Sequence, residues 1–392
     1  MKQLSKIVLL LLFGWLSACV VLPEDEPIFE DEAPVYFESV TDSAQYTGKE
    51  FLTNVLQLAY SDLFASYDIG IRIDVIRYYT TDPKGEKILA SGIVAYPVSA
   101  PIRSVVMAEH YTIAANHEAP SESKFVTESA LALLQYVVIT PDFLGFGVSK
   151  DVPHPYLHVE TTARTSLDML FAVREYMKQK ARPLADDISI IGYSQGAAAA
   201  LAVQKKAEEA YPDKIHVNKV LAGGGPYDLV AIFDDLKEKG ETAYACAVPM
   251  TVMGLDYGDN LSLNYAQLFT GSLLENYDEW INSKKYTTGE INDKIGTGYV
   301  DQFLHTDFFD YEMEMPAKLY ASLVKNSLTD WTPRAPIQLF HGTKDDVVPY
   351  ACSQNAYDSF KTKGCDVTLT PLTSDHKSSA PEFILYVLAA LM

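Results

Sequence analysis

The chain has 392 residues, of which 48% are hydrophobic and 21% charged, a composition that can bury a substantial core and excludes a wholly disordered protein. Its formal net charge of −21 at pH 7 repels polyanions, which argues against binding nucleic acids or anionic lipid headgroups through electrostatics. At roughly 150 residues per domain the length would give two domains. One large domain with insertions is the simpler interpretation.

The first 19 residues have the parts of a bacterial leader. Lys2 and Lys6 give a positive start, residues 7–15 are apolar, and Leu-Ser-Ala-Cys follows at residues 16–19. The apolar run is too short to span a bilayer permanently. The tetrad resembles the bacterial lipobox, which implies cleavage after residue 18, acylation of Cys19 with fatty acids such as palmitate, and a membrane anchor. The alternative is an ordinary secretory signal with a chance cysteine.

An acidic stretch that contains proline follows the leader. Residues 22–34 have the composition of an extended, solvated linker. We therefore expect a signal peptide at residues 1–18 and an acidic tether at residues 19–40. Acidic residues so soon after Cys19 also resemble the surface-export signals of some Gram-negative lipoproteins. The expected location is the bacterial cell envelope, at the outer membrane or cell surface.

Apolar runs and turn residues divide the rest of the chain into strands and helices. Residues 69–78 and 88–96 favour strands joined by a turn at residues 81–85, which predicts an antiparallel hairpin at a sheet edge. Runs typical of strands buried on both faces occur at residues 105–108, 137–140, 188–191, 220–222, 337–340 and 367–369. Helical patterns, such as residues 162–177 and 195–209, separate most of them. This alternation predicts an α/β fold with a mostly parallel, doubly wound sheet.

Residues 229–331 interrupt the alternation with helical stretches rich in aromatic residues. A structureless loop of this length would be unusual in a compact domain. Aromatic residues at helical spacing more often form a core than a ligand-binding surface. We therefore predict a helical lid inserted between a first part of the core, residues 41–228, and a second part, residues 332–392.

The pentad G-x-S-x-G occupies residues 192–196, directly after one predicted strand and directly before an alanine-rich helix. In this setting glycines let a serine sit in a strained turn, and the start of the helix supplies a positive end. An isolated pentad is common by chance, and a structural serine in a tight turn is the alternative. The context predicts Ser194 as a nucleophile.

A serine nucleophile needs a base that takes its proton and a carboxylate that orients the base. The motif H-G-T-x-D-x-x-V-P begins at His341, and a late Asp-His pair ends at His376. These motifs resemble the α/β-hydrolase superfamily over residues 67–392. The resemblance implies Asp345 as the acid and His376 as the base, with Asp346 as the competing acid.

His341 is expected to be structural because it precedes the acid in the same turn. The remaining histidines are expected to serve loops and surfaces: His110, His117, His154, His158, His216 and His305.

Acyl transfer also needs N–H groups that stabilise the developing oxyanion. They usually come from the residue after the nucleophile and from the loop after the third strand. Gln195 would supply the first. In the second position, relatives carry a glycine where this chain has Tyr111, which leaves Thr112 and Tyr111 as candidates. We favour Thr112.

Two further segments narrow the relationship. Residues 141–147 read Pro-Asp-Phe-Leu-Gly-Phe-Gly, and residues 223–229 read Gly-Gly-Gly-Pro-Tyr-Asp-Leu, each after a predicted strand. With Tyr156, Leu157 and residues 161–168 between them, the layout is similar to the secretory lipase group, whose members cleave acyl esters beneath a helical lid. The resemblance implies an esterase or lipase that forms an acyl-enzyme on the serine and needs no metal or organic cofactor.

Other functions stay open at this point. A carbohydrate esterase that removes acetyl or feruloyl groups and a serine peptidase similar to prolyl oligopeptidase share these motifs, although nothing in the chain resembles the propeller of the latter. Outside the enzymes, the chain could be a glycan- or lipid-binding lipoprotein on an inactive hydrolase scaffold. The complete Ser, Asp, His set in chain order argues against that alternative.

Three cysteines, Cys246, Cys352 and Cys365, remain after the predicted cleavage at Cys19. They are too few for a disulfide scaffold and form no paired metal-ligand pattern. The expected topology places Cys352 and the lid that carries Cys246 at the catalytic end of the sheet, with Cys365 at the opposite end. If a bridge forms, we expect it between Cys246 and Cys352.

Overall fold

The computed structural model describes residues 35–51, 53, 69–124 and 126–392. The predicted signal peptide, Cys19 and most of the predicted tether lie outside the described residues. Val35–Met392 form one compact unit. Within the described ranges, no helix has the length and apolar character needed to cross a bilayer.

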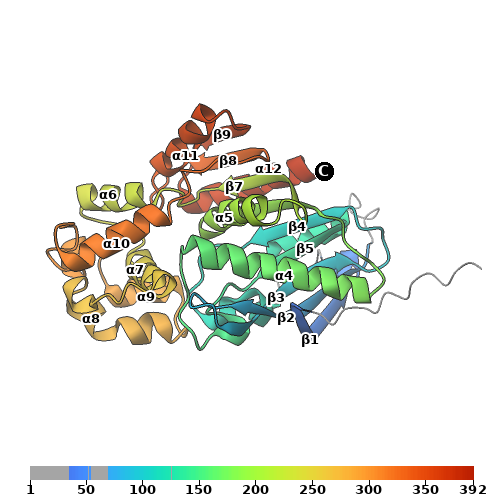
Figure 1. The fold of residues 1–392 in the computed structure, drawn as a ribbon, viewed down its shortest axis with the longest axis horizontal. Helices are drawn as coiled ribbons and strands as arrows, with labels where there is room; N and C mark the ends of the chain where they lie inside the picture. The colour runs from blue at the N-terminus through green and yellow to red at the C-terminus, as the bar shows by residue number, and fades with distance from the viewer. Residues whose placement is uncertain (1–34, 52, 54–68, 125) are drawn as a thin grey trace, which may run out of the picture. The chain divides into compact units, whose positions relative to one another are not determined.

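In the described part of the chain, nine strands form one sheet in the order β1-β2-β3-β5-β4-β6-β7-β8-β9 (Figure 1). The first three pairs in this order are antiparallel and the other five are parallel. The strands are β1 (Phe37–Tyr46), β2 (Ile71–Thr81), β3 (Lys87–Pro97), β4 (Ser104–Glu109), β5 (Tyr136–Pro141), β6 (Asp187–Tyr193), β7 (His216–Gly223), β8 (Ile337–Gly342) and β9 (Val367–Leu372). The predicted α/β fold with a mostly parallel sheet is confirmed.

β1 is the one strand of this sheet that the sequence did not predict. Six of its ten residues are polar, and two register irregularities interrupt its pairing with β2, so it shows no clean alternation. It takes residues 37–40 out of the predicted tether and into the sheet. The β2–β3 hairpin is antiparallel as predicted, but it lies one strand in from the edge.

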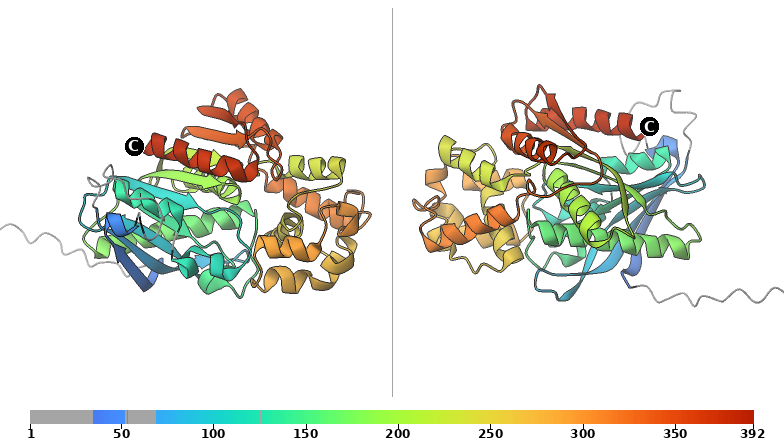
Figure 2. Two further views of the ribbon diagram at one scale, coloured as in Figure 1. Left: turned by 180° about the vertical axis from the view of Figure 1, so that it is seen from behind. Right: turned by 45° about the horizontal axis from the view of Figure 1, so that its top comes forward.

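Helices cover both faces of the sheet (Figures 1 and 2). One face carries α4 (Val159–Gln179), α5 (Gln195–Ala210) and α11 (Tyr350–Thr362), and the other carries η4 (Thr127–Leu134) and α12 (His376–Leu391). Leu167 and Phe360 are fully buried on the first face, and Phe383 is buried on the second. Burying a large apolar side chain contributes roughly 1.5–3 kcal/mol. Shorter elements are α2 (Gly48–Glu50), η3 (Asn116–Glu118), α3 (Pro120–Ser123) and η5 (Gly147–Ser149).

The chain leaves the sheet after β7 and returns at β8. We call residues 229–331, which lie between these strands, the helical insertion. Its elements are α6 (Leu229–Lys239), α7 (Ala247–Asp259), η6 (Tyr265–Gln267), α8 (Gly271–Tyr277), η7 (Asp278–Asn282), α9 (Thr288–Ile295), η8 (Val300–Gln302) and α10 (Glu314–Lys325). It has an apolar core of its own, which includes Phe233, Phe269, Trp280, Phe303 and Phe308. Many of its aromatic residues therefore pack as core.

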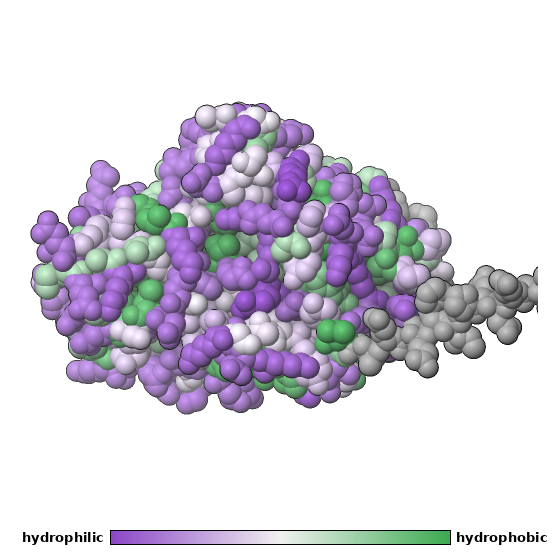
Figure 3. Space-filling view, viewed as in Figure 1, coloured by the Kyte–Doolittle hydropathy of each residue, from purple (hydrophilic) through white to green (hydrophobic). Residues whose placement is uncertain are grey.

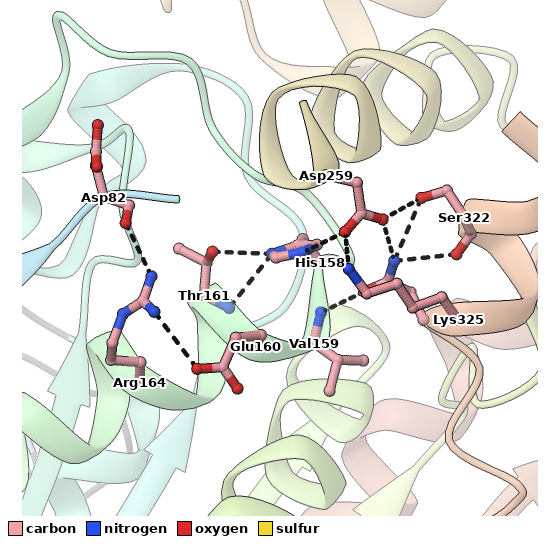
Figure 4. A network of polar contacts seen from close by, with 10 residues as sticks. Asp82, His158, Val159, Glu160, Thr161, Arg164, Asp259, Ser322 and Lys325 are labelled. Carbon is pink, nitrogen blue, oxygen red and sulfur yellow. Dashed lines mark hydrogen bonds and ion pairs between the residues drawn. The ribbon is translucent and has the colours of Figure 1, made fainter. Parts of the chain in front are cut away.

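Asp259, the last residue of α7, joins the helical insertion to the start of α4 (Figure 4). Its carboxylate accepts a hydrogen bond from Nε2 of His158 at 3.1 Å. It also accepts from Oγ of Ser322 at 2.5 Å and Nδ2 of Asn326 at 2.9 Å, and it pairs with Lys325. Burial acts to raise the pKa of Asp259, but the hydrogen bonds from His158, Lys325 and Ser322 outweigh it and hold the pKa below its ordinary value.

The surface seen in the orientation of Figure 1 is largely hydrophilic, with hydrophobic residues in small, scattered groups (Figure 3). Scattered apolar residues are ordinary on a folded protein. This face therefore shows no large apolar patch.

Candidate active site

Ser194 lies in the turn between β6 and α5. Its backbone has φ of 57° and ψ of −124°. A positive φ is strained for a residue with a Cβ and persists where the surrounding structure enforces it, often at functional sites. The N–H of Ser194 donates to the carbonyl oxygen of Gly223 at the end of β7, 2.8 Å away, which holds the turn against the neighbouring strand.

The two glycines of the pentad are required by close approaches of the backbone. A Cβ on Gly192 would lie 2.0 Å from the carbonyl oxygen of Gly196. A Cβ on Gly196 would lie 2.0 Å from the carbonyl oxygen of Glu109, the last residue of β4. The serine turn is therefore pressed against the start of the loop that carries Tyr111 and Thr112.

His376 connects the serine with a carboxylate. Nε2 of His376 lies 2.9 Å from Oγ of Ser194, and Nδ1 lies 2.6 Å from Oδ2 of Asp345. A carboxylate can only accept, so Nδ1 carries the proton and Nε2 accepts from the serine hydroxyl. His376 begins α12 directly after the last strand, and Asp345 lies in the turn after β8. The structure thus brings together three residues that are 182 and 31 positions apart in sequence.

Asp345 is held in its ionised form. Its side chain is fully buried, whereas that of His376 is 13% exposed. Oδ1 of Asp345 accepts from the backbone N–H groups of Val347 at 3.0 Å and Val348 at 2.8 Å. Burial acts to raise the pKa of Asp345, but hydrogen bonds from His341 and His376 outweigh it and hold the pKa well below its ordinary value.

The two candidate acids, Asp345 and Asp346, make different contacts with His376. Oδ1 of Asp346 lies 3.5 Å from the backbone N of His376, which donates to it, and not beside the imidazole nitrogen that Asp345 contacts. Nε2 of His341 donates to the carbonyl oxygen of Val348 at 2.9 Å and lies 3.3 Å from Oδ2 of Asp345. His341 therefore supports the turn that carries the acid, which agrees with its expected structural role.

Tyr193, the residue before the serine, supports the base in a way that the sequence did not indicate. Its hydroxyl donates to the carbonyl oxygen of His376 at 2.6 Å, and the two rings are 5.3 Å apart. The middle positions of the pentad accept many residue types, so no local signal marked this contact.

Gln195 has the place expected of an oxyanion donor. It is the first residue of α5, so its N–H has no acceptor within the helix. Nε2 of its side chain lies 3.0 Å from Nε2 of His154, whose Nδ1 lies 2.7 Å from the carbonyl oxygen of Leu144. Nδ1–H of His154 therefore donates to Leu144 and Nε2 accepts from Gln195. Burial lowers the pKa of His154 to about 3, which keeps the ring neutral.

The two candidates for the second donor differ in their surroundings. Tyr111 is 64% exposed, whereas Thr112 is buried, with Oγ1 2.9 Å from the hydroxyl of Tyr156.

From the sequence we expected His110, His154 and His158 to serve loops and surfaces, but all three side chains are buried. Their burial depends on contacts between distant segments, which no local pattern reports.

The expected bridge between Cys246 and Cys352 is wrong. Both thiols are free and buried. Cys246 belongs to the apolar core of the helical insertion, whereas Sγ of Cys352 lies 3.5 Å from the carbonyl oxygen of Asp228. Burial raises the pKa of both thiols, so both stay protonated.

A cavity of about 550 Å³ lies beside the turn that carries Asp345. Asp346, Val347 and Pro349 of this turn line one part, and α6 and α7 with the segment between them line another. The residues of the helical insertion that line it include Phe233, Leu236, Tyr244, Val248, Asp235 and Glu241.

Over the residues that the structure describes, no cluster of three or more His, Cys, Asp or Glu side chains could hold a metal ion.

Solved structures of esterases and lipases resemble this protein in fold. The rice cell wall degrading esterase LipA from Xanthomonas oryzae matches with a TM-score of 0.75 and 22% identity, over 90% of this chain and 98% of that one. Candida antarctica lipase A matches with a TM-score of 0.63 and 16% identity, over 86% of this chain and 77% of that one. These matches show the α/β-hydrolase fold.

Sequence comparison gives relatives among secreted lipases. A secreted triacylglycerol lipase of Malassezia globosa is 27% identical over 277 residues, which cover 67% of this chain and 55% of the relative. One from Malassezia restricta is 21% identical, over 64% of this chain and 53% of the relative. The chain thus spans about half the length of these relatives. The model of the secretory lipase family matches residues 124–383, about two thirds of the chain, and the protein therefore belongs to that family.

Proposed function

We propose that the protein is a serine hydrolase that cleaves carboxylic esters through an acyl-enzyme on Ser194. The observation that carries the proposal is the position of His376, which lies within hydrogen-bond distance of both Ser194 and the buried, ionised Asp345. A neutral imidazole with its Nδ1 proton held by a carboxylate can take the serine proton at Nε2. The membership of the chain in the secretory lipase family supports an ester substrate.

The reaction has two halves. In the first, the hydroxyl of Ser194 attacks the ester carbonyl while Nε2 of His376 takes its proton. The imidazolium, stabilised by Asp345, then gives this proton to the departing alcohol, and an acyl-serine remains. In the second half, the same nitrogen takes a proton from the water that attacks the acyl group, and the imidazolium then returns this proton to Oγ of Ser194 as the C–O bond breaks and the acid leaves.

The negative charge on the tetrahedral oxygen needs donors that are already in place. We assign the backbone N–H groups of Gln195 and Thr112 to this task. Gln195 supplies one of the free N–H groups at the positive end of α5. Thr112 is favoured over Tyr111 because its burial and its contact with Tyr156 fix its position, whereas Tyr111 extends into solvent.

The cavity of about 550 Å³ beside the acid turn is the proposed place for part of the substrate. It is lined by both the core and the helical insertion, so the helical insertion would act as the lid predicted from the sequence. Phe233, Leu236 and Val248 suit an acyl chain.

Hydrolysis of p-nitrophenyl esters from acetate to palmitate tests the proposal. The purified protein is expected to hydrolyse at least one chain length, and Ser194→Ala is expected to reduce kcat by several orders of magnitude with the fold unchanged by circular dichroism. The proposal is wrong if the two proteins hydrolyse all esters at the same rate.

The polar part of the same cavity favours a second candidate substrate class. Asp235, Glu241 and Thr242 line it and can bond sugar hydroxyls. A neighbour in fold is called a cell wall degrading esterase. Acetylated xylan and feruloyl esters, assayed beside the p-nitrophenyl series, distinguish a carbohydrate esterase from a lipase.

We further propose that Cys19 carries a lipid that anchors the protein in a bacterial envelope. The lipobox-like tetrad supports this location, and the secreted relatives support export. When the full chain is expressed in a bacterium supplied with alkyne-palmitate, the wild type and Cys365→Ala are expected to be labelled and found with membranes. Cys19→Ala is expected to lose both properties. Equal labelling of Cys19→Ala would contradict the anchor.

A further inference from the structure

Lys284 is a buried cation without a partner. The residue is 5% exposed, and among the described residues Nζ has no hydrogen-bond or ion-pair partner. Its neighbour Lys285 behaves like an ordinary surface lysine, with a side chain that is 63% exposed and paired with Glu279 at 3.0 Å. Burying an unpaired ammonium group is unfavourable. A negatively charged group of a ligand would supply the missing partner.

The backbone around Lys284 is unusual, and the unusual geometry places this side chain inside. The π-helical turn η7 ends at Asn282, two residues before it. Lys284 itself has φ of 56°, a left-handed conformation that is strained for a lysine. Its carbonyl oxygen accepts from the N–H of Asn116 at 2.8 Å, which ties the turn to the loop after β4. Both π-turns and strained residues are frequent at functional sites.

The cavity that Lys284 lines lies directly behind the proposed oxyanion donors. Two other lining residues, His154 and Tyr156, hydrogen-bond the side chains of Gln195 and Thr112. The rest of the lining is mostly apolar and comprises Ala114, Phe146, Met250, Met253, Ile281 and Asn282. Nζ also lies 5.8 Å from the centre of the Phe146 ring, within reach of a weak cation–π contact.

In this structure the cavity has a volume of about 10 Å³, room for about one water molecule. Two of its walls are the methionines Met250 and Met253. A ligand group larger than water would require these unbranched, adaptable side chains to move.

We propose that Lys284 binds a carboxylate on the ester substrate, so that this enzyme selects esters whose acyl or alcohol part carries an acidic group. The inference rests on the proposed function of Ser194. A carboxylate fits because it supplies the missing charge and the missing hydrogen-bond acceptors, while the apolar lining suits the carbon chain that carries it. The net charge of −21 would otherwise repel such a substrate, which makes a local cation necessary.

The electrostatics of Lys284 agree with this role. Burial lowers its pKa to about 8, and the charge of Asp278 opposes the shift. The side chain is therefore mostly charged at neutral pH. His154, the other titratable group of the cavity lining beside Tyr156, stays neutral and offers no competing charge.

Matched ester pairs test the proposal. On the acyl side the pairs are mono-p-nitrophenyl adipate with p-nitrophenyl hexanoate, and mono-p-nitrophenyl suberate with p-nitrophenyl octanoate. On the alcohol side the pair is 4-acetoxybenzoate with phenyl acetate. We expect Lys284→Met to lower kcat/KM for the acidic member of at least one pair by roughly 10- to 100-fold, because the substitution removes a charge-assisted hydrogen bond to the carboxylate. The neutral members should change by less than about threefold, and Lys285→Met should change neither.

The outcomes separate this inference from the proposed function. Lys284→Met should fold, with an unchanged or higher Tm, because it removes an unpaired buried charge. Lys284→Arg, which keeps the charge, should retain part of the preference. If the wild type hydrolyses neutral esters and Lys284→Met leaves the acidic-to-neutral ratio unchanged in all pairs, the carboxylate site is wrong while the esterase stands. If no ester is hydrolysed, the proposed function itself fails.

Discussion

Oδ2 of Asp345 lies 2.6 Å from Nδ1 of His376, and the neighbouring Asp346 reaches only the backbone of the same histidine. This geometry favours Asp345 over Asp346 as the acid, two adjacent carboxylates that the sequence alone left as alternatives. The turn after β8 points one of them at the imidazole and the other at the peptide N–H. The consequences for activity differ accordingly.

Asp345→Asn is expected to lower kcat by about 10⁴-fold, because an amide no longer fixes the tautomer of His376 or stabilises the imidazolium. Asp346→Asn should keep kcat within a few-fold of the wild type, since its contact with the backbone N–H at 3.5 Å is weak, and any effect of its place in the cavity lining should fall on KM. Steady-state kinetics on a p-nitrophenyl ester measure both. A larger loss in Asp346→Asn would reassign the acid.

Gly196→Ala is expected to reduce kcat by at least about 10²-fold, comparable with the loss of one oxyanion donor. The added Cβ would lie 2.0 Å from the carbonyl oxygen of Glu109 and would push the serine turn away from the loop of Thr112. Gly289→Ala is the matched control, because a Cβ there meets only Oγ1 of Thr287 at 4.0 Å. Full activity in Gly196→Ala would show that this contact does not position the site.

Glu109 makes stability depend on pH. Burial raises the pKa of Glu109 to about 8, although a hydrogen bond from Ser166 opposes the shift. The folded protein therefore keeps a proton that the unfolded chain releases above its ordinary pKa of 4.5. The contribution of Glu109 to the free energy of unfolding is complete below pH 4.5. As the pH rises from 4.5 toward 8, this free energy falls by up to about 1.4 kcal/mol per pH unit.

Glu109→Gln removes this titration, so the free energy of unfolding should fall less between pH 5 and pH 9 than in the wild type. Urea denaturation at several pH values measures the slope. Glu86→Gln, on the exposed β2–β3 turn, should keep the slope of the wild type. An unchanged slope in Glu109→Gln would show that the carboxyl group ionises freely.

Asp259→Asn is expected to destabilise the helical insertion first. The substitution removes the charge from a side chain that is 4% exposed and accepts hydrogen bonds from His158, Ser322 and Asn326, and the loss of a hydrogen bond to a charged group costs about 1.5–3 kcal/mol. Limited proteolysis should show faster cleavage within residues 229–331, and urea denaturation should show lower stability. Glu314→Gln, which breaks the exposed pair with Lys318, should cost less than about 1 kcal/mol.

Features that depend on short, local stretches of sequence could be predicted. The central strands β4 and β6 are covered on both faces, so their apolar runs are continuous and recognisable. Ser194 was predicted from a pentad whose neighbouring strand and helix are local. Asp345 and His376 were assigned through the resemblance to a fold family, and the structure brings both to the serine.

Features that depend on distant contacts could not be predicted. Lys284 is one lysine of a Lys-Lys pair in the sequence, and only the folded chain shows that it turns inward while Lys285 stays exposed. The Gln195–His154 contact joins residues 41 positions apart without a motif. The disulfide prediction failed for the same reason: the expected topology placed two cysteines at one end of the sheet but could not show which groups surround each thiol.

Covalent labelling of the full chain with a fluorophosphonate, followed by mass spectrometry of the labelled peptide, tests most directly whether Ser194 is the nucleophile. We expect one adduct, on Ser194, formed by the wild type and absent from both Ser194→Ala and His376→Ala. An adduct on another serine, or no adduct on the folded wild-type protein, would contradict this assignment and would favour an inactive, ligand-binding scaffold.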